Sequence, residues 1–282
     1  MKVFLIPNLE KANAVACTIK AAAILDAYGV ATMMEDRYHG VFLNLQTVFS
    51  SFDTCASECD LFLSVGGDGT MIQSAKQAVL FDKPILGINA GRLGFMAGLE
   101  ADELSLLSKL VTGEYRTQKR MMLDCVHHTK QGDTSYLALN DIVVSNGGLS
   151  RMVDISVSCA NAGPISYRAD GVILSTPTGS TAYALSAGGP LIDPSVDSIG
   201  LTAICPHSLM TRPAVFSPDT VLIVRPSPIN RNSVYLTVDG NEGEELLAGD
   251  YIEVKRSERV VKLISLKDTG FYETLRKKFG IE

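Results

Sequence analysis

The spacing of apolar segments changes along this chain and divides its 282 residues into two parts. From residue 1 to about 110, short runs rich in β-branched residues alternate with longer segments of helical periodicity. This alternation predicts a parallel sheet with crossover helices. After about Lys119, many short apolar runs are separated by Gly, Pro, Asn and Asp, which is typical of an antiparallel β domain. A chain of this length is expected to form two domains.

The first part, residues 1–115, is predicted to be a doubly wound, Rossmann-like α/β domain. Its first helix should end at Gly29, because glycine readily adopts the left-handed conformation that ends helices. The residues expected on the buried face of that helix are Val15, Ile19, Ala22 and Ala23. Strands are expected at 3–7, 30–34, 61–65 and 85–88.

The second part, residues 116–264, is predicted to be an antiparallel β-sandwich, with one exception at 176–189, where the pattern is not that of a strand. Its predicted strands are MMLDCVHH, YLALNDIVVS, VDISVSC, GVILST, VLIVRPS, SVYLTV and YIEVKRS. The last segment, 265–282, contains FYETLRKKFG, which is helical and basic in its last turn. We expect this helix to pack back on the first domain.

Charge and apolar content limit the classes of partner. A formal charge of −6 and a pI near 5.3 argue against binding nucleic acid, which requires a concentrated basic face. The start, MKVFLIPNLEKANAV, lacks the features of a signal peptide, and no apolar run reaches the ~20 residues of a membrane span. We therefore expect a cytoplasmic protein that has no membrane partner and acts on a small polar substrate.

The cysteines and histidines do not form an evident metal or disulfide framework. The six cysteines, at positions 17, 55, 59, 125, 159 and 205, are scattered and mostly lie in apolar runs. Their even number allows disulfides, but cytosolic thiols are kept reduced, so we expect packed free thiols. The four histidines lack the spacing of zinc ligands, so no structural metal is expected.

A glycine-rich turn follows the predicted strand at 61–65. In Gly66-Gly67-Asp68-Gly69-Thr70, glycines let backbone N–H groups approach an anion, and a following helix would add its positive N-terminus. The segment is neither GxGxxG nor a P-loop. A carboxylate beside phosphates is costly unless it has a chemical role, so Asp68 is a candidate general base or metal anchor for phosphoryl transfer.

A hairpin is the alternative structure for this turn, because Asp-Gly pairs often join two strands. The residues after the turn argue against it. Ile72, Ala75 and Val79 recur at helical spacing within 71–80.

Two further polar clusters lie in the β-rich part. In STPTGSTAYALSAGG, which begins at Ser175, hydroxyl and N–H groups converge where a helix could begin, forming either a capped turn or a polar wall for a ribose or amide. Tyr183 could pack on a ring or simply in a core. Asn140 and Asp141 interrupt the apolar run LALNDIVVS. They form either a bulge or turn, or a site at which a carboxylate accepts hydrogen bonds from both hydroxyl groups of a ribose diol.

Several motifs together resemble the NAD kinase family. The GGDGT sequence at 66–70 is shared by NAD kinases and by diacylglycerol and sphingosine kinases, with relatives among phosphofructokinases. Other segments that are similar to NAD kinases extend the resemblance over nearly the whole chain: Asn89-Ala90-Gly91-Arg92-Leu93-Gly94-Phe95, Leu139-Asn140-Asp141, DGVILSTPTGSTAYALSAGGP from Asp170, His207 with Arg212-Pro213, and Asp239-Gly240-Asn241.

The resemblance implies transfer of the γ-phosphoryl group of ATP, or a phosphoryl group of polyphosphate, to the 2′-hydroxyl of the adenosine ribose of NAD. Asp68 would accept the proton, Gly66, Gly67, Gly69 and Thr70 would bind phosphates, and a divalent metal such as Mg²⁺ would assist. The residues implied to contact NAD are Asp68, Gly69, Phe95, Asn140, Asp141, Arg151, Arg168, Asp170, Thr178, Thr181, Ala182, Tyr183, Ala184, Leu185, Ser186 and Asn241.

The resemblance also implies a homodimer or homotetramer in which some of these residues act on a neighbouring subunit's site. Two positions depart from the family's commonest pattern. Asp141 stands where many members have Glu, and Gln73 follows the glycine turn where some relatives carry a basic residue. Donor affinity or donor choice is therefore open.

Two alternative functions are also compatible with the glycine turn. A lipid kinase with the same glycine turn predicts an apolar acceptor channel in the second domain, which the hydroxyl-rich segment 175–186 does not favour. A non-catalytic dinucleotide-binding regulator predicts binding of NAD or NADP without turnover. The presence of Asp68 argues against the regulator.

Overall fold

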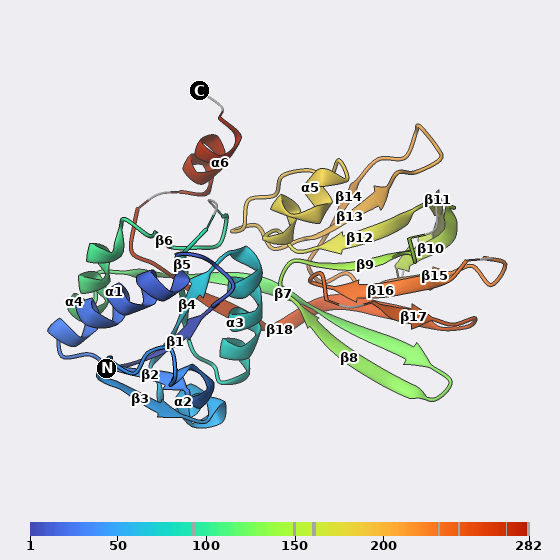
Figure 1. Ribbon diagram of the computed structural model, residues 1–282. Coiled ribbons are helices and arrows are strands. Elements are labelled where there is room, and N and C mark those ends of the chain that lie inside the picture. Colours follow the sequence, from blue (N-terminus) through green and yellow to red (C-terminus); the bar gives the residue numbers. More distant parts are fainter. Residues whose placement is uncertain are drawn as a thin grey trace. The chain divides into compact units, whose positions relative to one another are not determined.

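The computed structural model describes residues 1–91, 94–148, 151–159, 162–230, 232–241, 243–268 and 270–280. The chain forms two compact units, Met1–Lys119 with Val261–Glu282, and Arg120–Val260. Two long strands, β7 (Arg116–Thr129) and β18 (Tyr251–Ser265), contain residues of both units. Figure 1 labels the elements. No helix in the described ranges is long and apolar enough to cross a membrane.

The first unit is built on a parallel sheet in the order β3-β2-β1-β4-β5. The short β6 and the end of β18 pair with β5. The elements are β1 (Lys2–Pro7), α1 (Ala14–Ala27), β2 (Ala31–Glu35), η1 (Asp36–Tyr38), β3 (Thr47–Ser50), α2 (Phe52–Glu58), β4 (Leu61–Gly66), α3 (Asp68–Leu80), β5 (Ile85–Asn89), β6 (Leu99–Glu100), η2 (Leu104–Leu107), α4 (Ser108–Thr112) and α6 (Phe271–Phe279).

Helices cover both faces of this sheet, so the predicted doubly wound α/β fold is confirmed (Figure 1). On one face, Leu5 and Leu63 pack in a cluster with Leu25 of α1 and Leu107 of η2. On the other face, Phe4 and Phe62 pack with Phe52 of α2 in edge-to-face contacts. The strands are buried on both faces, which explains their continuous apolar sequences.

The expected buried face of α1 is confirmed only in part: Ala22 is buried and Val15 packs against the core, but Ala23 is exposed. Ile19 is exposed, whereas the residues that face the sheet are Ala14, Cys17, Thr18, Ala21, Ala22 and Leu25. Apolar residues occur around most of this helix, so its periodicity did not select one face. Small residues allow the helix to approach the sheet closely, and this close packing decides which face is buried. The predicted helix end is confirmed, since Gly29 follows α1 with φ of 71°.

The second unit is an antiparallel β-sandwich, as predicted. One sheet contains β7, β8 (Gly132–Ala138), β10 (Val153–Cys159), β11 (Ala162–Ala169), β15 (Leu222–Pro226) and β18. The other has the order β14-β13-β12-β9-β16-β17, with β9 (Asp141–Asn146), β12 (Gly171–Ser175), β13 (Ile199–Ile204), β14 (Ala214–Phe216), β16 (Val234–Val238) and β17 (Glu244–Leu246). Buried residues of both sheets, such as Leu123 and Val144, form one core.

The exception at 176–189 contains η3 (Gly179–Thr181) and α5 (Tyr183–Ser186), which follow β12. Ala184 of α5 packs on Val143 and Ile173, on the side of the sheet away from the sandwich core. The central strand β12 is therefore buried on both faces. The single run YLALNDIVVS is divided into β8 and β9 at Leu139-Asn140.

All six cysteines are free, and Cys17, Cys55, Cys59 and Cys125 are buried, as expected for packed thiols. Cys205 is exposed.

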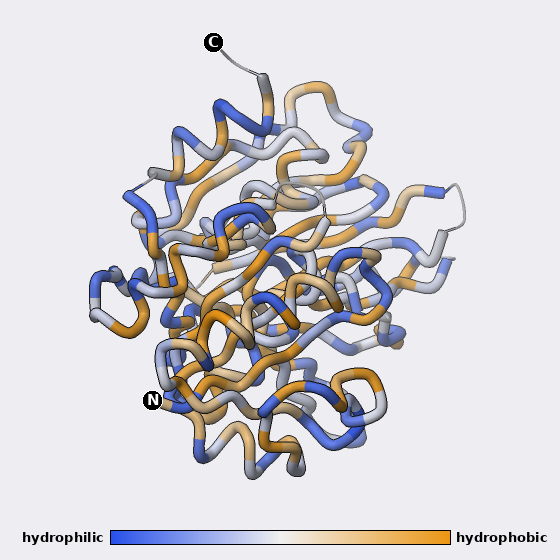
Figure 2. The backbone as a smooth tube through the Cα atoms, turned by 60° about the vertical axis from the view of Figure 1, so that its left-hand side comes forward, coloured by the Kyte–Doolittle hydropathy of each residue, from blue (hydrophilic) through white to orange (hydrophobic). Residues whose placement is uncertain are grey.

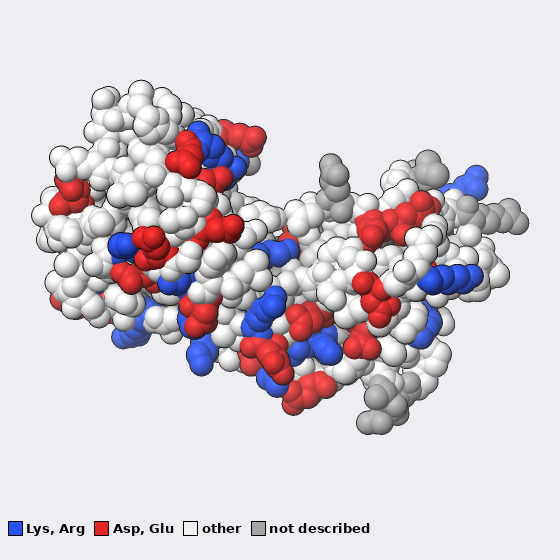
Figure 3. All heavy atoms as spheres, turned by 90° about the horizontal axis from the view of Figure 1, so that it is seen from below, with Lys and Arg blue, Asp and Glu red and all other residues white. Residues whose placement is uncertain are grey.

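Figure 2 shows the hydropathy along the backbone. The helix next to the C-terminus contains hydrophilic segments, and its last turn carries Arg276, Lys277 and Lys278. On the face shown in Figure 3, basic side chains lie among acidic ones.

Candidate active site

The glycine turn lies where the direction of chain winding reverses. After β1 the chain continues through α1 to β2 on one side, and after β4 it continues through α3 to β5 on the other. In open α/β sheets, ligands bind outside the carboxyl ends of the strands at such a reversal. The connections that follow β1 and β4 are therefore the expected binding segments of this unit, and Gly66, Gly67 and Asp68 form the second, from the end of β4 to the start of α3.

The turn is a strand-to-helix connection, so the hairpin alternative is wrong. Strand β4 ends at Gly66, Gly67 is the N-cap, and Asp68 is the first residue of α3. The first N–H groups of a helix have no partner within the helix, and the space around Gly69 is open. These N–H groups can therefore receive a phosphate.

Packing explains why Gly66 carries no side chain. A Cβ atom there would lie 2.5 Å from Thr70 Oγ1. The same Thr70 hydroxyl accepts a hydrogen bond of 2.8 Å from Asn8 Nδ2, in the loop after β1. The two loops at the reversal are thus joined through the predicted phosphate-binding residue Thr70.

The Asp68 carboxylate is held in one orientation by the segment at 94–96. Its Oδ2 accepts the N–H group of Phe95 at 3.1 Å, and its Oδ1 accepts that of Met96 at 3.3 Å. A Cβ atom on Gly94 would overlap Oδ1 at 2.1 Å. Asp68 is half-buried, and the two N–H groups fix its carboxylate beside the helix N-terminus. Arg92 and Leu93, in the same motif, lie outside the described residues.

The ring of Phe95 packs against the C-terminal helix. Its ring contacts α6, with the Phe279 ring centroid at 6.0 Å and Lys278 Nζ at 4.0 Å from the ring centroid. Its N–H group binds Asp68. In this arrangement the main chain of Phe95 orients the carboxylate while the ring packs against the C-terminal helix.

Lys11 is a residue of this site that the sequence analysis did not identify. It follows β1, and its Cε lies 3.9 Å from the position of a Cβ atom on Gly67. Lys11 is exposed and can place its ammonium group near a phosphate at the turn. The signal in the sequence is only its position shortly after a buried strand.

A second group of predicted residues surrounds the corner between β8 and β9. The Asp239 carboxylate accepts the N–H groups of Leu139, Asn140 and Asp141 at 3.0, 2.7 and 3.1 Å. Asp239 lies between β16 and β17 with φ of 51°. Asn140 lies in the bend between the two strands and Asp141 begins β9, so the corner is a turn that is organised by a remote carboxylate.

Asn140 and Asp141 have the properties of ligand-binding groups. Asn140 Oδ1 is buried and has no hydrogen-bond partner in the described part of the protein, although buried acceptors are normally satisfied. Burial, and then the charge of Asp239, raise the pKa of Asp141 to about 7. A ligand that donates hydrogen bonds would satisfy the first group and favour the charged form of the second.

The hydroxyl groups of the segment at 175–186 build the turn itself. Thr176 donates to the Leu139 carbonyl at 2.6 Å, Ser180 to Pro177 at 2.7 Å and Thr181 to Thr178 at 2.9 Å. A Cβ atom on Gly179 would lie 1.9 Å from the Asn140 carbonyl oxygen. These hydroxyl groups therefore bond within the segment and to the neighbouring corner, against which the turn packs.

The remaining residues of this segment differ in exposure. Ala184 is buried against Val143 and Ile173, Thr178 is also buried, and Tyr183 is exposed. Partial burial raises the pKa of Tyr183, and the neighbouring Cys205, Asp170 and Asp141 raise it further. Thr181, Ala182 and Leu185 are half-buried, and Ser186 is exposed.

Arg151 and Arg168 lie together in a pocket of about 610 Å³ in the second unit. His207 lines the same pocket, and its backbone N–H group donates to the Arg168 carbonyl at 2.8 Å. The other lining residues are Met152, Asp154, Ile229, Asn230 and Asn232. Two guanidinium groups and an imidazole beside one carboxylate suit an anionic ligand. Asn241 lies apart from this pocket, in the turn that carries Asp239.

Within the described ranges, no group of three or more His, Cys, Asp and Glu side chains could hold a metal ion. A metal that binds mainly through substrate phosphates and water needs no such group. Asp68 is the carboxylate at the phosphate-binding turn that could contribute to it.

The sequence matches two family models over most of its length. Residues 8–115 match the ATP-NAD kinase N-terminal domain, and residues 139–266 match the ATP-NAD kinase C-terminal domain.

Curated relatives agree with this result. The NAD kinase of Natranaerobius thermophilus is 35% identical over 277 residues, which cover 97% of this chain and 96% of that protein. The NAD kinase of Symbiobacterium thermophilum is 37% identical and covers 99% of both chains. That of Syntrophotalea carbinolica is 42% identical over 225 residues, 78% of each chain.

Two solved structures share the fold. The yeast NADH kinase complexed with NADH superposes with a TM-score of 0.89 at 22% identity, covering 100% of this chain and 88% of that one. An NAD kinase from Archaeoglobus fulgidus in complex with ATP gives a TM-score of 0.73 at 22% identity, covering 99% and 98%. On the two family models and the identity to curated relatives, the chain belongs to the NAD kinase family.

Proposed function

We propose that this protein is an NAD kinase, which transfers the γ-phosphoryl group of ATP to the 2′-hydroxyl of the adenosine ribose of NAD and forms NADP. One observation carries the proposal at the level of chemistry. A carboxylate is fixed by two backbone N–H groups at the N-terminus of α3, where the sheet reverses its winding. That place suits phosphate binding, and a carboxylate there needs a chemical role.

The phosphate donor would be held by backbone N–H groups of the turn. Gly66 and Gly67 leave room for close approach, Gly69 faces open space, and Thr70 fixes the turn to Asn8. Lys11 would supply the cation that Gln73 cannot. Polyphosphate presents the same phosphoryl chemistry as ATP, so this cradle also fits polyphosphate as donor.

Asp68 would accept the proton of the 2′-hydroxyl. The 2′-oxygen attacks the γ-phosphorus, its proton passes to a carboxylate oxygen of Asp68, and the bond from the γ-phosphorus to the β,γ-bridging oxygen breaks, releasing ADP. The hydrogen bonds from Phe95 and Met96 keep this carboxylate oriented. Mg²⁺, which usually binds through one or two carboxylates and substrate phosphates, would offset the charge of the triphosphate.

The acceptor would be held by residues of the second unit. Asn140 Oδ1 can accept a hydrogen bond from the dinucleotide, and the Asp141 carboxylate can accept hydrogen bonds from both hydroxyl groups of a ribose. The segment at 178–186, Asp170 and Asn241 would complete this site. Arg168 and Arg151, which line one pocket, would contact anionic parts of a dinucleotide bound to the same or a neighbouring subunit.

We further propose that the protein is a cytoplasmic homodimer or homotetramer. Highly exposed apolar residues on the second unit, including Leu209, Met210 and Ile229, are consistent with association. Light scattering measures the mass in solution, and a monomer at micromolar concentration would contradict this part.

The test of function is direct. The purified protein is incubated with NAD and Mg²⁺, together with ATP or polyphosphate, and NADP is detected with a dehydrogenase specific for it. Parallel reactions use NADH and diacylglycerol as acceptors. We expect NADP with ATP as donor and no phosphorylated lipid. NAD or NADP binding without turnover would instead indicate a regulator.

A further inference from the structure

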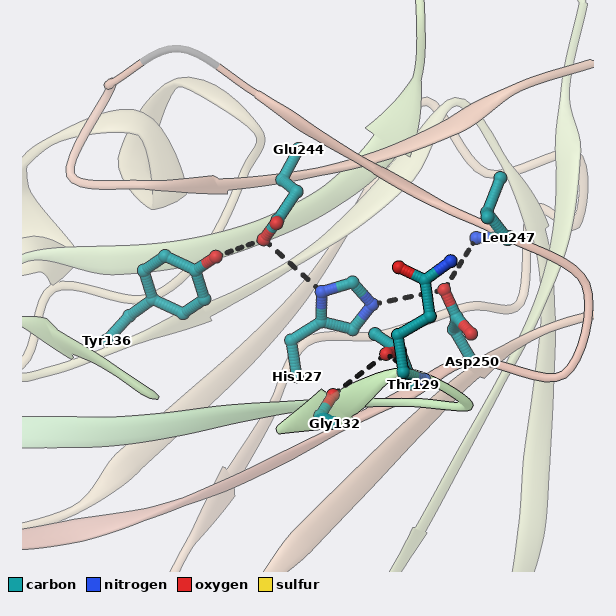
Figure 4. A network of polar contacts seen from close by, with 8 residues as sticks. His127, Thr129, Gly132, Tyr136, Glu244, Leu247 and Asp250 are labelled. Carbon is teal, nitrogen blue, oxygen red and sulfur yellow. Dashed lines mark hydrogen bonds and ion pairs between the residues drawn. The ribbon is translucent and has the colours of Figure 1, made fainter. Parts of the chain in front are cut away.

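One buried histidine of the second unit lies between two carboxylates. His127 of β7 is almost fully buried, its Nδ1 is 3.2 Å from Glu244 Oε2, and its Nε2 is 3.2 Å from Asp250 Oδ2. Figure 4 shows the imidazole ring between these two side chains. The Asp250 side chain is buried and that of Glu244 is half-exposed.

Both carboxylates have a second donor. The Tyr136 hydroxyl on β8 donates to the same oxygen of Glu244, and the Leu247 N–H group donates to Asp250 Oδ2 at 2.9 Å. Burial, and then the hydrogen bond to Glu244, raise the pKa of Tyr136 to about 12, so its hydroxyl remains a donor. The network therefore connects β7, β8 and β17 with the turn before β18 (Figure 4).

The geometry of the imidazole suits this arrangement, because its two ring nitrogens point in different directions and each faces a different carboxylate. Cys125 lies on the same strand near Glu244, and burial raises its pKa to about 12, which keeps the thiol neutral. Lys130 lies near the turn, with its Cε 4.0 Å from the position of a Cβ atom on Gly249.

The network is connected to the corner that carries Asn140 and Asp141. Glu244 begins β17 and pairs with Leu236 of β16. Between these two strands the chain turns at Asp239, whose carboxylate accepts the three N–H groups of the corner. A displacement of Glu244 therefore acts on the turn that sets the position of Asp239.

We propose that His127 is a positioning residue for the dinucleotide-binding corner. Its hydrogen bond to Glu244 fixes β17, and β17 with β16 places the Asp239 carboxylate under Leu139, Asn140 and Asp141. The kinetic part of this inference rests on the proposed function, since it assigns the corner to NAD. The structural part, the connection from His127 to the corner, does not depend on the proposed function.

The neighbouring histidine provides a matched control. His128 also lies on β7, with Nδ1 3.0 Å from Asp133 Oδ2 and its ring stacked on Tyr251 at 4.5 Å. Its carboxylate partner in the described part of the chain is Asp133, whereas His127 lies between Glu244 and Asp250. His127→Asn and His128→Asn make the same chemical change one residue apart.

Hydrogen exchange of the backbone tests the structural part without any substrate. In His127→Asn, the N–H groups of Leu139, Asn140 and Asp141 should exchange at least about fivefold faster than in the wild type, while those of β12 keep their rates. In His128→Asn all of these exchange rates should stay within twofold of the wild-type rates. Glu244→Gln preserves the side-chain size and serves as a second variant if His127→Asn does not fold.

Steady-state kinetics tests the consequence for NAD. His127→Asn should raise KM for NAD about fivefold or more and change kcat and KM for ATP less than twofold. Unchanged exchange at 139–141 in both His127→Asn and Glu244→Gln would overturn the inference, whatever the enzymatic activity. Faster exchange with an unchanged KM for NAD would leave the structural connection intact and contradict the assignment of the corner to NAD.

Discussion

The carboxylate of Asp239 lies 2.7 Å from the backbone nitrogen of Asn140 and accepts its N–H group. The residues on both sides of Asn140 donate to the same carboxylate. Asp239 has φ of 51°, a conformation that Asp and Asn adopt more readily than other residues with a side chain. One side chain therefore sets the path of the chain between β8 and β9.

Removing this carboxylate should destabilise the second unit. Asp239→Ala leaves three backbone N–H groups without their acceptor, and we expect the free energy of unfolding to fall by about 3 kcal/mol. Urea denaturation measures the change. The control is Asp219→Ala, which breaks an exposed ion pair with Arg256 and should cost less than about 1 kcal/mol. Equal midpoints for Asp239→Ala and the wild type would contradict the role of Asp239.

Asp141 should make stability depend on pH. Its pKa is raised from 3.8 to about 7 by burial and then by Asp239, so the folded protein holds this proton more tightly than the unfolded chain. The resulting stabilisation is fully present below about pH 4 and is lost as the pH rises to about 7. One pKa unit corresponds to about 1.4 kcal/mol, so the loss is on the order of 4 kcal/mol.

Asp141→Asn isolates this contribution. The difference in unfolding free energy between wild type and Asp141→Asn should change steadily between pH 4 and 7 and become constant above about pH 8. Denaturant titrations at a series of pH values measure it. In Asp239→Asn the region of change should move to lower pH, because one cause of the raised pKa is gone. A difference that does not vary with pH would contradict the raised pKa of Asp141.

The fold could be predicted because its signals are local. Strand-length and helix-length runs alternate in the first part, and short strands follow in the second. The strands β3, β6, β11, β13, β14 and β17 were not among the predicted ones. Of these, β14 and β17 contain only three residues each and β6 two, too few to show an alternation. The division of YLALNDIVVS also could not be read locally, since the carboxylate that divides it lies 98 to 100 residues away.

The candidate site was predictable in residue type more than in arrangement. Hydroxyl-rich residues at 176–181 suggest a polar wall, but their hydroxyl groups donate to nearby carbonyls, and composition cannot distinguish these outcomes. Lys11 has no motif around it, and it reaches Gly67 only because β1 and β4 are neighbours in the sheet. For Asp239, the Asp-Gly pair between two strand-like runs was a usable turn signal.

Asp68→Asn tests the chemical step. The variant keeps the size of the side chain and removes the charge, so turnover should fall by ~10²-fold or more, while NAD binding measured by calorimetry is largely preserved. An amide NH₂ group would also face an N–H group of Phe95 or Met96. A crystal structure or hydrogen exchange at 94–96 would show whether that segment has moved. Near-normal turnover would exclude Asp68 as the proton acceptor.

Lys11→Met tests the contact with the phosphate donor. The apolar part of the side chain is retained and the charge is lost, so KM for ATP should rise about tenfold, equivalent to about 1.4 kcal/mol, with KM for NAD unchanged. Lys20→Met, which removes an exposed charge from α1, is the control. If both variants have the same KM for ATP, Lys11 contributes only net charge.

Gly179→Ala tests whether the turn after β12 supports the Asn140 corner. A Cβ atom at this position would lie 1.9 Å from the Asn140 carbonyl oxygen, and backbone cannot yield as a flexible side chain can. The free energy of unfolding should fall by about 2 kcal/mol or more, and KM for NAD should rise because Asn140 is displaced. Gly40→Ala, where a Cβ atom has no neighbour within 4 Å, should change stability by less than about 0.5 kcal/mol. If the two variants were equally stable, the turn could not be packed against the corner, and the two predicted parts of the NAD site would have to be regarded as separate.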